Sequence, residues 1–114
     1  MIKKKNKFNA KKITIDGIIF DSKKEGYRYS VLKQLKGAKW ETERVVIIEL
    51  QPKFDIIVNS KKIGFYKADF RITYADGRVD VEDVKGLKKG SAYQLFRLKK
   101  TLVEALYEIE IIEV

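Results

Sequence analysis

Three turn dipeptides divide the chain into short apolar segments that alternate in the manner of β-strands. Asp16-Gly17, Asn59-Ser60 and Asp76-Gly77 each stand between two such segments, and Asp-Gly is one of the strongest hairpin signals. Two longer stretches differ, because their apolar residues recur every three or four positions, as on one face of an α-helix. The sequence therefore predicts short antiparallel strands combined with two helices.

The expected elements form one domain. In chain order they are a hairpin (13–20), a helix (22–36), four strands (45–50, 54–58, 63–74 and 79–85), a second helix from residue 91 and a closing strand (109–114). Because a helix connects the last two strands, they should pair in parallel. The predicted fold class is α/β, with a central mixed β-sheet flanked by two helices.

Positive charge is concentrated in two parts of the chain. The net charge is +9, and residues 1–12 carry six lysines and no acidic residue. We expect 1–12 to be a flexible basic arm and 13–114 to be the folded domain. The second acid-free basic stretch runs from Lys85 to Lys100. A basic domain of 114 residues favours an anionic partner, with nucleic acid ahead of membrane. The arm itself is read equally well as a solvated terminus or as a phosphate-contacting tail.

The chain contains no cysteine and no histidine. This excludes disulfides, thiol nucleophiles, thiolate metal sites, Ser-His-Asp triads and imidazole bases. Any catalysis must use carboxylates, lysines, hydroxyls or a metal ion with oxygen ligands, so Mg²⁺ or Mn²⁺ is the expected cofactor. The sequence has neither the apolar run of a membrane-spanning helix nor that of a signal peptide, which leads us to expect a soluble, cytoplasmic protein.

Asp83 and Lys85 are the first candidate site residues. Two positions apart at the end of a predicted strand, they point to the same face. A carboxylate that holds a metal ion beside an amine that stabilises phosphate charge is an arrangement suited to phosphodiester hydrolysis. Taken alone, the same two residues are better explained as an ordinary surface ion pair at a strand end, because this spacing is common in basic proteins. Glu82 is a rival ligand, but strand alternation should point it away from Lys85.

Two further acidic residues precede this pair. Asp69 lies in the predicted strand 63–74, where pairing with Lys67 or Arg71 is the simpler interpretation. Glu25 follows Ser22 by three positions, which fits a helix capping box. Glu25 can reach a metal ion only if the start of the helix faces the edge of the sheet.

The order and spacing of these residues resemble the PD-(D/E)XK nuclease superfamily. The likeness is closest to a family of small phage-encoded, Holliday-junction-resolvase-like endonucleases, and it extends from Asn9 to Val114. The motifs that carry it are FDSKKE (20–25), LQPKF (50–54), ADF (68–70) and VEDVKG (81–86). Ala68 occupies the position of the proline that precedes the first aspartate in many members.

The resemblance implies a metal-dependent, structure-selective DNA endonuclease from a phage or prophage, acting in the cytoplasm of a bacterial host. It implies that Asp69, Asp83 and Glu25 hold the metal ion and that Lys85 is the catalytic lysine. Resolvase-like cutting of branched DNA would also imply a homodimer. The expected DNA-contacting residues, from the basic stretch and the second helix, are Lys88, Lys89, Gln94, Arg97, Lys99 and Lys100.

One property of the predicted hairpin opposes this site. If the strands pair symmetrically about Asp76-Gly77, Phe70 faces Asp83, and Asp69 then lies on the opposite face of the sheet from Asp83. A shared metal site requires either a shift of one residue, which a bulge or an odd-length loop at Gly77 would supply, or a strand end that is twisted enough to bring the groups together. We therefore predict an irregularity between Phe65 and Asp83.

Three functions remain in competition on the sequence alone. The first is the metal-dependent endonuclease, and the second is a nucleic-acid-binding module that has a nuclease-like fold and no turnover. The third is a protein that binds an acidic partner through its basic arm. In that case the aromatic residues Phe65, Tyr66, Phe70 and Tyr74 would belong to an interface, although a strand core is their commoner location.

Overall fold

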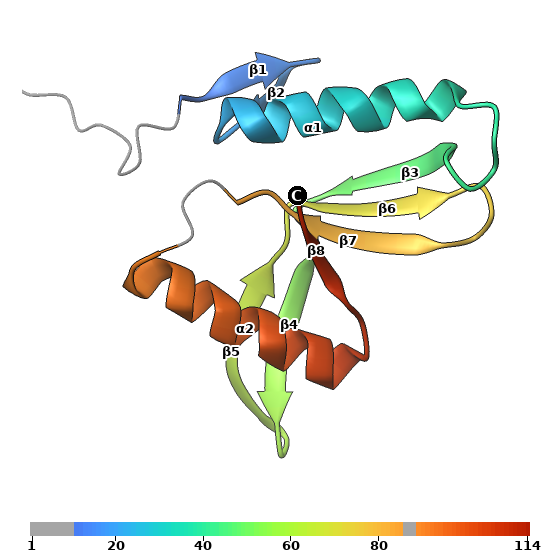
Figure 1. The fold of residues 1–114 in the computed structure, drawn as a ribbon. Coiled ribbons are helices and arrows are strands. Elements are labelled where there is room, and N and C mark those ends of the chain that lie inside the picture. The colour runs from blue at the N-terminus through green and yellow to red at the C-terminus, as the bar shows by residue number, and fades with distance from the viewer. Residues whose placement is uncertain (1–10, 86–88) are drawn as a thin grey trace, which may run out of the picture.

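Short strands and two long helices make up the protein (Figure 1). The computed structural model describes residues 11–85 and 89–114. In chain order the elements are β1 (Ile13–Ile15), β2 (Ile18–Phe20), α1 (Lys23–Gln34), the 3₁₀ helix η1 (Leu35–Gly37), β3 (Val45–Leu50), β4 (Lys53–Val58), β5 (Lys61–Lys67), β6 (Phe70–Tyr74), β7 (Val79–Asp83), α2 (Ser91–Tyr107) and β8 (Ile111–Glu113).

The central sheet has four strands in the order β3-β6-β7-β8. β7 and β8 pair in parallel, and the other two pairings are antiparallel, which confirms the predicted mixed sheet. Helix α1 and the hairpin β1-β2 cover one face of this sheet (Figure 1). A buried cluster fills the space between them, and its members include Phe20, Tyr29, Leu32, Phe70 and Ile72.

A second pair of strands, β4 and β5, continues the ribbon formed by β3 and β6. The predicted strand 63–74 is therefore wrong in its continuity, because the chain leaves the strand conformation at Ala68 and Asp69. The opposite strand breaks at the same level, next to Pro52, whose C=O accepts from the Ala68 N–H at 3.1 Å. Both strands thus turn together, and Asp69 lies at the bend.

Helix α2 packs against the β4-β5 ribbon. It contributes the fully buried Val103, which lies in a second apolar cluster with Phe54, Ile56, Val81 and Ile111. This cluster connects the β4-β5 ribbon to β7 and β8 of the central sheet, so the two helices flank different parts of the strand system. The predicted α/β architecture with two flanking helices is confirmed.

The start of α1 is fixed by two local features. Ser22 is the N-cap, and its Oγ accepts from the Glu25 N–H at 3.1 Å. A Cβ added at Gly26 would lie 2.6 Å from Ile13 Cγ2, so the absence of a side chain lets the helix pack directly onto β1. Both features hold the first turn of α1 beside the hairpin, at the bent end of the central sheet (Figure 1).

Residues 1–10, the greater part of the predicted basic arm, lie outside the described residues. Within the described ranges, the structure contains no helix that is both long and apolar enough to cross a membrane.

Candidate functional site

The loop between β6 and β7 sets the register on which the candidate site depends. The Tyr74 N–H donates to the Arg78 C=O at 2.9 Å, which closes a loop of three residues, Ala75 to Gly77. Gly77 has φ of 92°, a conformation that glycine adopts without strain. The symmetric register about Asp76-Gly77 is therefore wrong by one residue, and the predicted irregularity is confirmed.

The shift brings the two aspartates to the same level of the hairpin. Phe70 pairs with Glu82, so the next position outward places Asp69 opposite Asp83, where cross-strand neighbours share one face. The Asp69 N–H donates to the Glu82 C=O at 3.1 Å. Asp69 Oδ2 accepts from the Val84 N–H at 2.7 Å. The bend and the loop together assemble this acidic pair.

Burial and mutual proximity alter the ionisation of the pair. Burial and, after it, the neighbouring carboxyl group of Glu25 together raise the pKa of Asp69 to about 6. Burial likewise raises the pKa of Asp83 to about 7, with the adjacent carboxyl group of Asp69 as a further cause. Two buried carboxylates that face each other cannot both be ionised without a free-energy cost.

A dependence of stability on pH follows from these values. The pKa values of about 6 and about 7 exceed the ordinary 3.8 of an aspartate. Between about pH 4 and pH 7 the native state therefore binds more protons than the unfolded state. The free energy of unfolding should therefore fall as the pH rises from about 4 to about 7. We expect the Asp69→Asn, Asp83→Asn double variant to be about 2–4 kcal/mol more stable than the wild type at pH 8 without metal.

Urea unfolding in EDTA at a series of pH values measures this effect. The matched control is Glu43→Gln, which neutralises an exposed carboxylate and should leave the slope of stability against pH unchanged. The raised pKa values would be contradicted if the free energy of unfolding of the wild type rose from pH 4 to pH 7 in parallel with that of the double variant.

Glu25 approaches the pair from α1. It lines a hollow of about 190 Å³ together with Asp69, Asp21 and Gln51, which we call the α1 hollow. Its backbone N–H takes part in the N-cap at Ser22, while its carboxyl group acts on the pKa of Asp69. The cap and the acidic site are therefore compatible roles, and the start of α1 faces the edge of the sheet as the site requires.

Lys85 approaches from the other side. Its Nζ lies 3.6 Å from Asp83 Oδ1 and 3.8 Å from the centroid of the Phe96 ring on α2. The Asp83 side chain is only 4% exposed, so this is not a surface ion pair. Backbone hydrogen bonds hold the segment, because the Val114 N–H donates to the Asp83 C=O at 2.9 Å and the Lys85 N–H to the Val114 C=O at 3.4 Å.

Asp83 and Lys85 line a second hollow of about 280 Å³ between β5 and α2, which we call the α2 hollow. It also receives Lys99 from α2 and Phe65 from β5. The acidic pair therefore lies between two cavities, with Asp69 lining the α1 hollow and Asp83 the α2 hollow.

Glu82 is not a member of this site. Its carboxylate receives two hydrogen bonds from Arg28 of α1, one from Nε at 2.7 Å and one from Nη2 at 2.6 Å. The Glu82 side chain is 3% exposed. It forms a bidentate ion pair between the helix and β7, which fits the prediction that it points away from Lys85.

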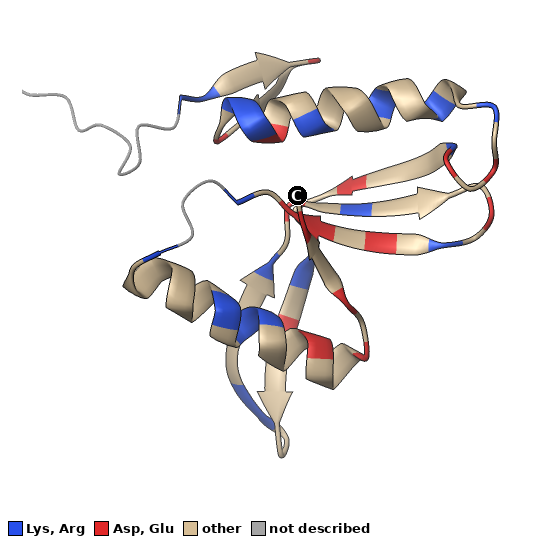
Figure 2. Cartoon of the chain, viewed as in Figure 1, with Lys and Arg blue, Asp and Glu red and all other residues tan. Residues whose placement is uncertain are grey.

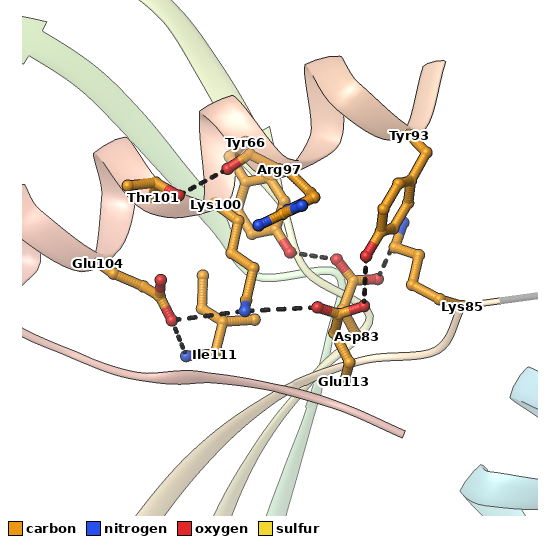
Figure 3. A network of polar contacts seen from close by, with 10 residues as sticks. All are labelled: Tyr66, Asp83, Lys85, Tyr93, Arg97, Lys100, Thr101, Glu104, Ile111 and Glu113. Carbon is orange, nitrogen blue, oxygen red and sulfur yellow. Dashed lines mark hydrogen bonds and ion pairs between the residues drawn. The ribbon is translucent and has the colours of Figure 1, made fainter. Parts of the chain in front are cut away.

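The expected DNA-contacting residues are distributed over several environments. Lys88 lies outside the described residues, while Lys89, Gln94 and Arg97 are exposed. Lys99 lines the α2 hollow. Lys100 instead points toward β8, where Nζ lies 3.5 Å from Glu113 Oε2 and 3.8 Å from Glu104 Oε2 (Figure 3). Of the described members of the set, Lys99 thus shares the α2 hollow with Asp83, whereas Lys100 belongs to an ion network with Glu104 and Glu113.

One residue of the site, Tyr66, and one residue beside it, Arg28, have roles that were not anticipated from the sequence. The hydroxyl of Tyr66 donates to Asp83 Oδ2 (Figure 3), and burial raises the pKa of Tyr66 far above its ordinary value. Arg28 is the partner of Glu82 described above. Tyr66 stands in an ordinary alternating strand pattern and Arg28 in an ordinary polar helix face, so the sequence carries no signal for either role.

Comparison with known proteins yields one match. The family model described as "Protein of unknown function (DUF1064)" matches residues 5–111. Neither the curated proteins nor the solved structures contain a match to the chain. Because the family model spans nearly the whole sequence, the chain belongs to the DUF1064 family of proteins of unknown function.

Proposed function

We propose that this protein is a metal-dependent DNA endonuclease that hydrolyses phosphodiester bonds. The observation that carries the proposal is the one-residue shift in the β6-β7 register, which places Asp69 opposite Asp83 with Lys85 3.6 Å from Asp83. A carboxylate at the bend before β6, a carboxylate at the end of β7 and a neighbouring amine are the groups that metal-assisted phosphodiester hydrolysis uses.

The donor groups suit a hard divalent cation. Mg²⁺ keeps several of its waters and is commonly held by only one or two carboxylates. Among the described residues no group of three or more acidic side chains forms a metal cluster, so Asp69 and Asp83 would be the principal ligands, with Glu25 beside them. A bound cation would also favour the ionised forms of both carboxyl groups, whose pKa values are raised chiefly by burial. When bound, Mg²⁺ or Mn²⁺ would supply Lewis-acid polarisation of the phosphate oxygens.

The chain's own residues supply the remaining functions. The Lys85 ammonium group, held between Asp83 and the Phe96 ring, is placed to stabilise negative charge on a phosphate in the α2 hollow. The net charge of +9 favours binding of the DNA backbone, which positions the substrate without reading its sequence. This suits selection of DNA by structure, as expected for branched substrates.

Cleavage of matched linear and branched DNA tests the proposal. The wild type should cut in Mg²⁺ or Mn²⁺ and be inactive in EDTA. We expect Lys85→Ala to lower the rate about a hundredfold or more. The matched control Lys61→Ala removes an equal charge at the far end of the β5 strand and should remain active. Equal rates for the wild type and Lys85→Ala would show a contaminating nuclease or a wrong assignment.

One observation favours a second function, a nucleic-acid-binding module without turnover. Asp83 already receives the Tyr66 hydrogen bond and faces the Lys85 ammonium group, so the pair could serve only to hold β5, β7 and α2 together. In that case DNA binding would depend on salt, would ignore Mg²⁺ and would survive the loss of Asp69 and Asp83, because removing the carboxylates also removes repulsion of phosphate.

A further inference from the structure

An exposed aromatic ring stands at the mouth of the α2 hollow. Phe65 belongs to β5, which pairs on one side with β4, and 42% of its surface is exposed. The adjacent Tyr66 points inward to Asp83, so neighbouring side chains of one strand line the hollow at two depths. The Phe65 ring is therefore a solvent-facing apolar surface beside the candidate catalytic groups.

Three ammonium groups surround this ring. The distances from the ring centroid to the Nζ atoms are 4.7 Å for Lys53, 5.9 Å for Lys67 and 5.7 Å for Lys99. The lysines come from β4, β5 and α2, and both β4 and β5 have a basic segment at the end nearest to the acidic β7 (Figure 2). Like charges brought together from three elements repel one another, so the arrangement favours an anionic ligand.

The same hollow contains the catalytic candidates. Phe65, Lys67 and Lys99 line it together with Asp83 and Lys85. The first turn of α2 contributes Ala92, and the N-cap of that helix is Gly90, which has no side chain to satisfy the free N–H groups. A ligand bound on the ring would thus have phosphates close to both the lysines and Asp83.

A flat apolar surface flanked by cations matches one component of nucleic acid. An unpaired nucleotide offers a free base face for stacking and a phosphate on either side, whereas the bases of a regular duplex are already stacked on one another. Resting on the proposed function, we propose that Phe65, with Lys53, Lys67 and Lys99, binds an unpaired nucleotide next to the scissile phosphate. The substrate is then DNA with a single-stranded or unstacked segment, such as a branch point.

DNA binding measured without cleavage tests this stacking platform, by which we mean Phe65 with Lys53, Lys67 and Lys99. Fluorescence anisotropy in EDTA would compare a single-stranded oligonucleotide with a duplex of the same length, for the wild type, Phe65→Ala and Phe65→Trp. Phe65→Ala should weaken single-strand binding about tenfold and change duplex binding far less. Phe65→Trp should retain the preference for single-stranded DNA over duplex. In a Trp40→Phe background, the single strand should quench the fluorescence of the tryptophan introduced at position 65. A single strand with an abasic site at the bound position should not quench it.

Two controls separate stacking from other effects. Ile63→Ala removes another exposed apolar side chain of β5 that does not line the hollow and should leave both affinities unchanged. Lys67→Ala and Lys99→Ala should weaken both forms of DNA and reduce the salt dependence.

Three results would overturn the platform. One is an equal loss of single-strand and duplex binding in Phe65→Ala. Another is equal behaviour of Phe65→Ala and Ile63→Ala. The third is a change of oligomeric state in Phe65→Ala by light scattering, which would make the ring an interface between copies of the chain. The binding assay is performed in EDTA, so its outcome does not depend on cleavage. If the platform passes these tests but the protein never cleaves DNA in Mg²⁺ or Mn²⁺, only the proposed endonuclease function is refuted.

Discussion

The Asp83→Asn variant should cleave DNA about a thousandfold or more slowly than the wild type in Mg²⁺, a loss of about 4 kcal/mol in transition-state stabilisation. The substitution removes a charge and one ligand oxygen from a residue that is 3% exposed. The amide oxygen of asparagine can still accept the Tyr66 hydrogen bond, so the shape of the site should persist. Far-UV circular dichroism would check the fold, and single-turnover cleavage the rate.

Asp76→Asn is the matched control for this variant. Asp76 is exposed in the β6-β7 loop and accepts the Arg78 N–H at 2.9 Å, a bond that asparagine can also make. Like Asp83→Asn, the control removes one carboxylate charge from the β6-β7 hairpin, and it should leave the rate of DNA cleavage unchanged. Metal binding gives an independent measurement, because Mg²⁺ at pH 8 should raise the melting temperature of the wild type and not that of Asp83→Asn. If Asp83→Asn cut DNA as fast as Asp76→Asn, the endonuclease proposal would be abandoned.

The Arg28→Ala variant should be about 3 kcal/mol less stable than the wild type. It leaves the Glu82 carboxylate, whose side chain is 3% exposed, without the guanidinium group that supplies two hydrogen bonds to it. The Arg28→Met, Glu82→Leu double variant should regain most of this loss, since it buries no charge. Urea unfolding at pH 7 measures both.

Lys33→Ala on the same helix provides the comparison. Its Nζ lies 2.5 Å from Asp16 Oδ2, but both side chains are more than two-fifths exposed, at 42% and 48%. An exposed pair of this kind contributes little to stability, because water and salt screen it. Equal losses in Arg28→Ala and Lys33→Ala would show that burial of Glu82 does not determine the stability of the α1–β7 contact.

Most of the fold could be predicted because its signals are local. Ser22 caps the first helix, and Asp16-Gly17 marks the first hairpin; these patterns depend on residues a few positions apart. The end of that helix was predicted less well, because α1 stops at Gln34 and residues up to Gly37 form the 3₁₀ helix η1. The break at Ala68 and Asp69 could not be predicted in the same way. It depends on Pro52, between β3 and β4, whose C=O accepts a hydrogen bond from the Ala68 N–H at 3.1 Å. Pro52 is distant from Ala68 in the sequence.

The candidate site was predictable in its residues and unpredictable in its geometry. The order of Glu25, Asp69, Asp83 and Lys85 identifies candidates, yet one residue of loop length decides whether the aspartates share a face. The Tyr74–Arg78 hydrogen bond at 2.9 Å resolves that choice. Partners such as Tyr66 for Asp83 depend on how strands pack in three dimensions, and no spacing rule connects them.

The C-terminal strand has a consequence for the order in which the site forms. Val114 exchanges backbone hydrogen bonds with Asp83 and Lys85, and β8 is the parallel neighbour of β7. Pairing of such sequence-distant segments is slow, and during synthesis it must wait until the later segment has been made. A nascent chain that already contains all four candidate residues therefore lacks the strand that fixes Lys85 beside Asp83. Translation of β8 completes the candidate site, so the proposed nuclease activity would require that strand to have left the ribosome.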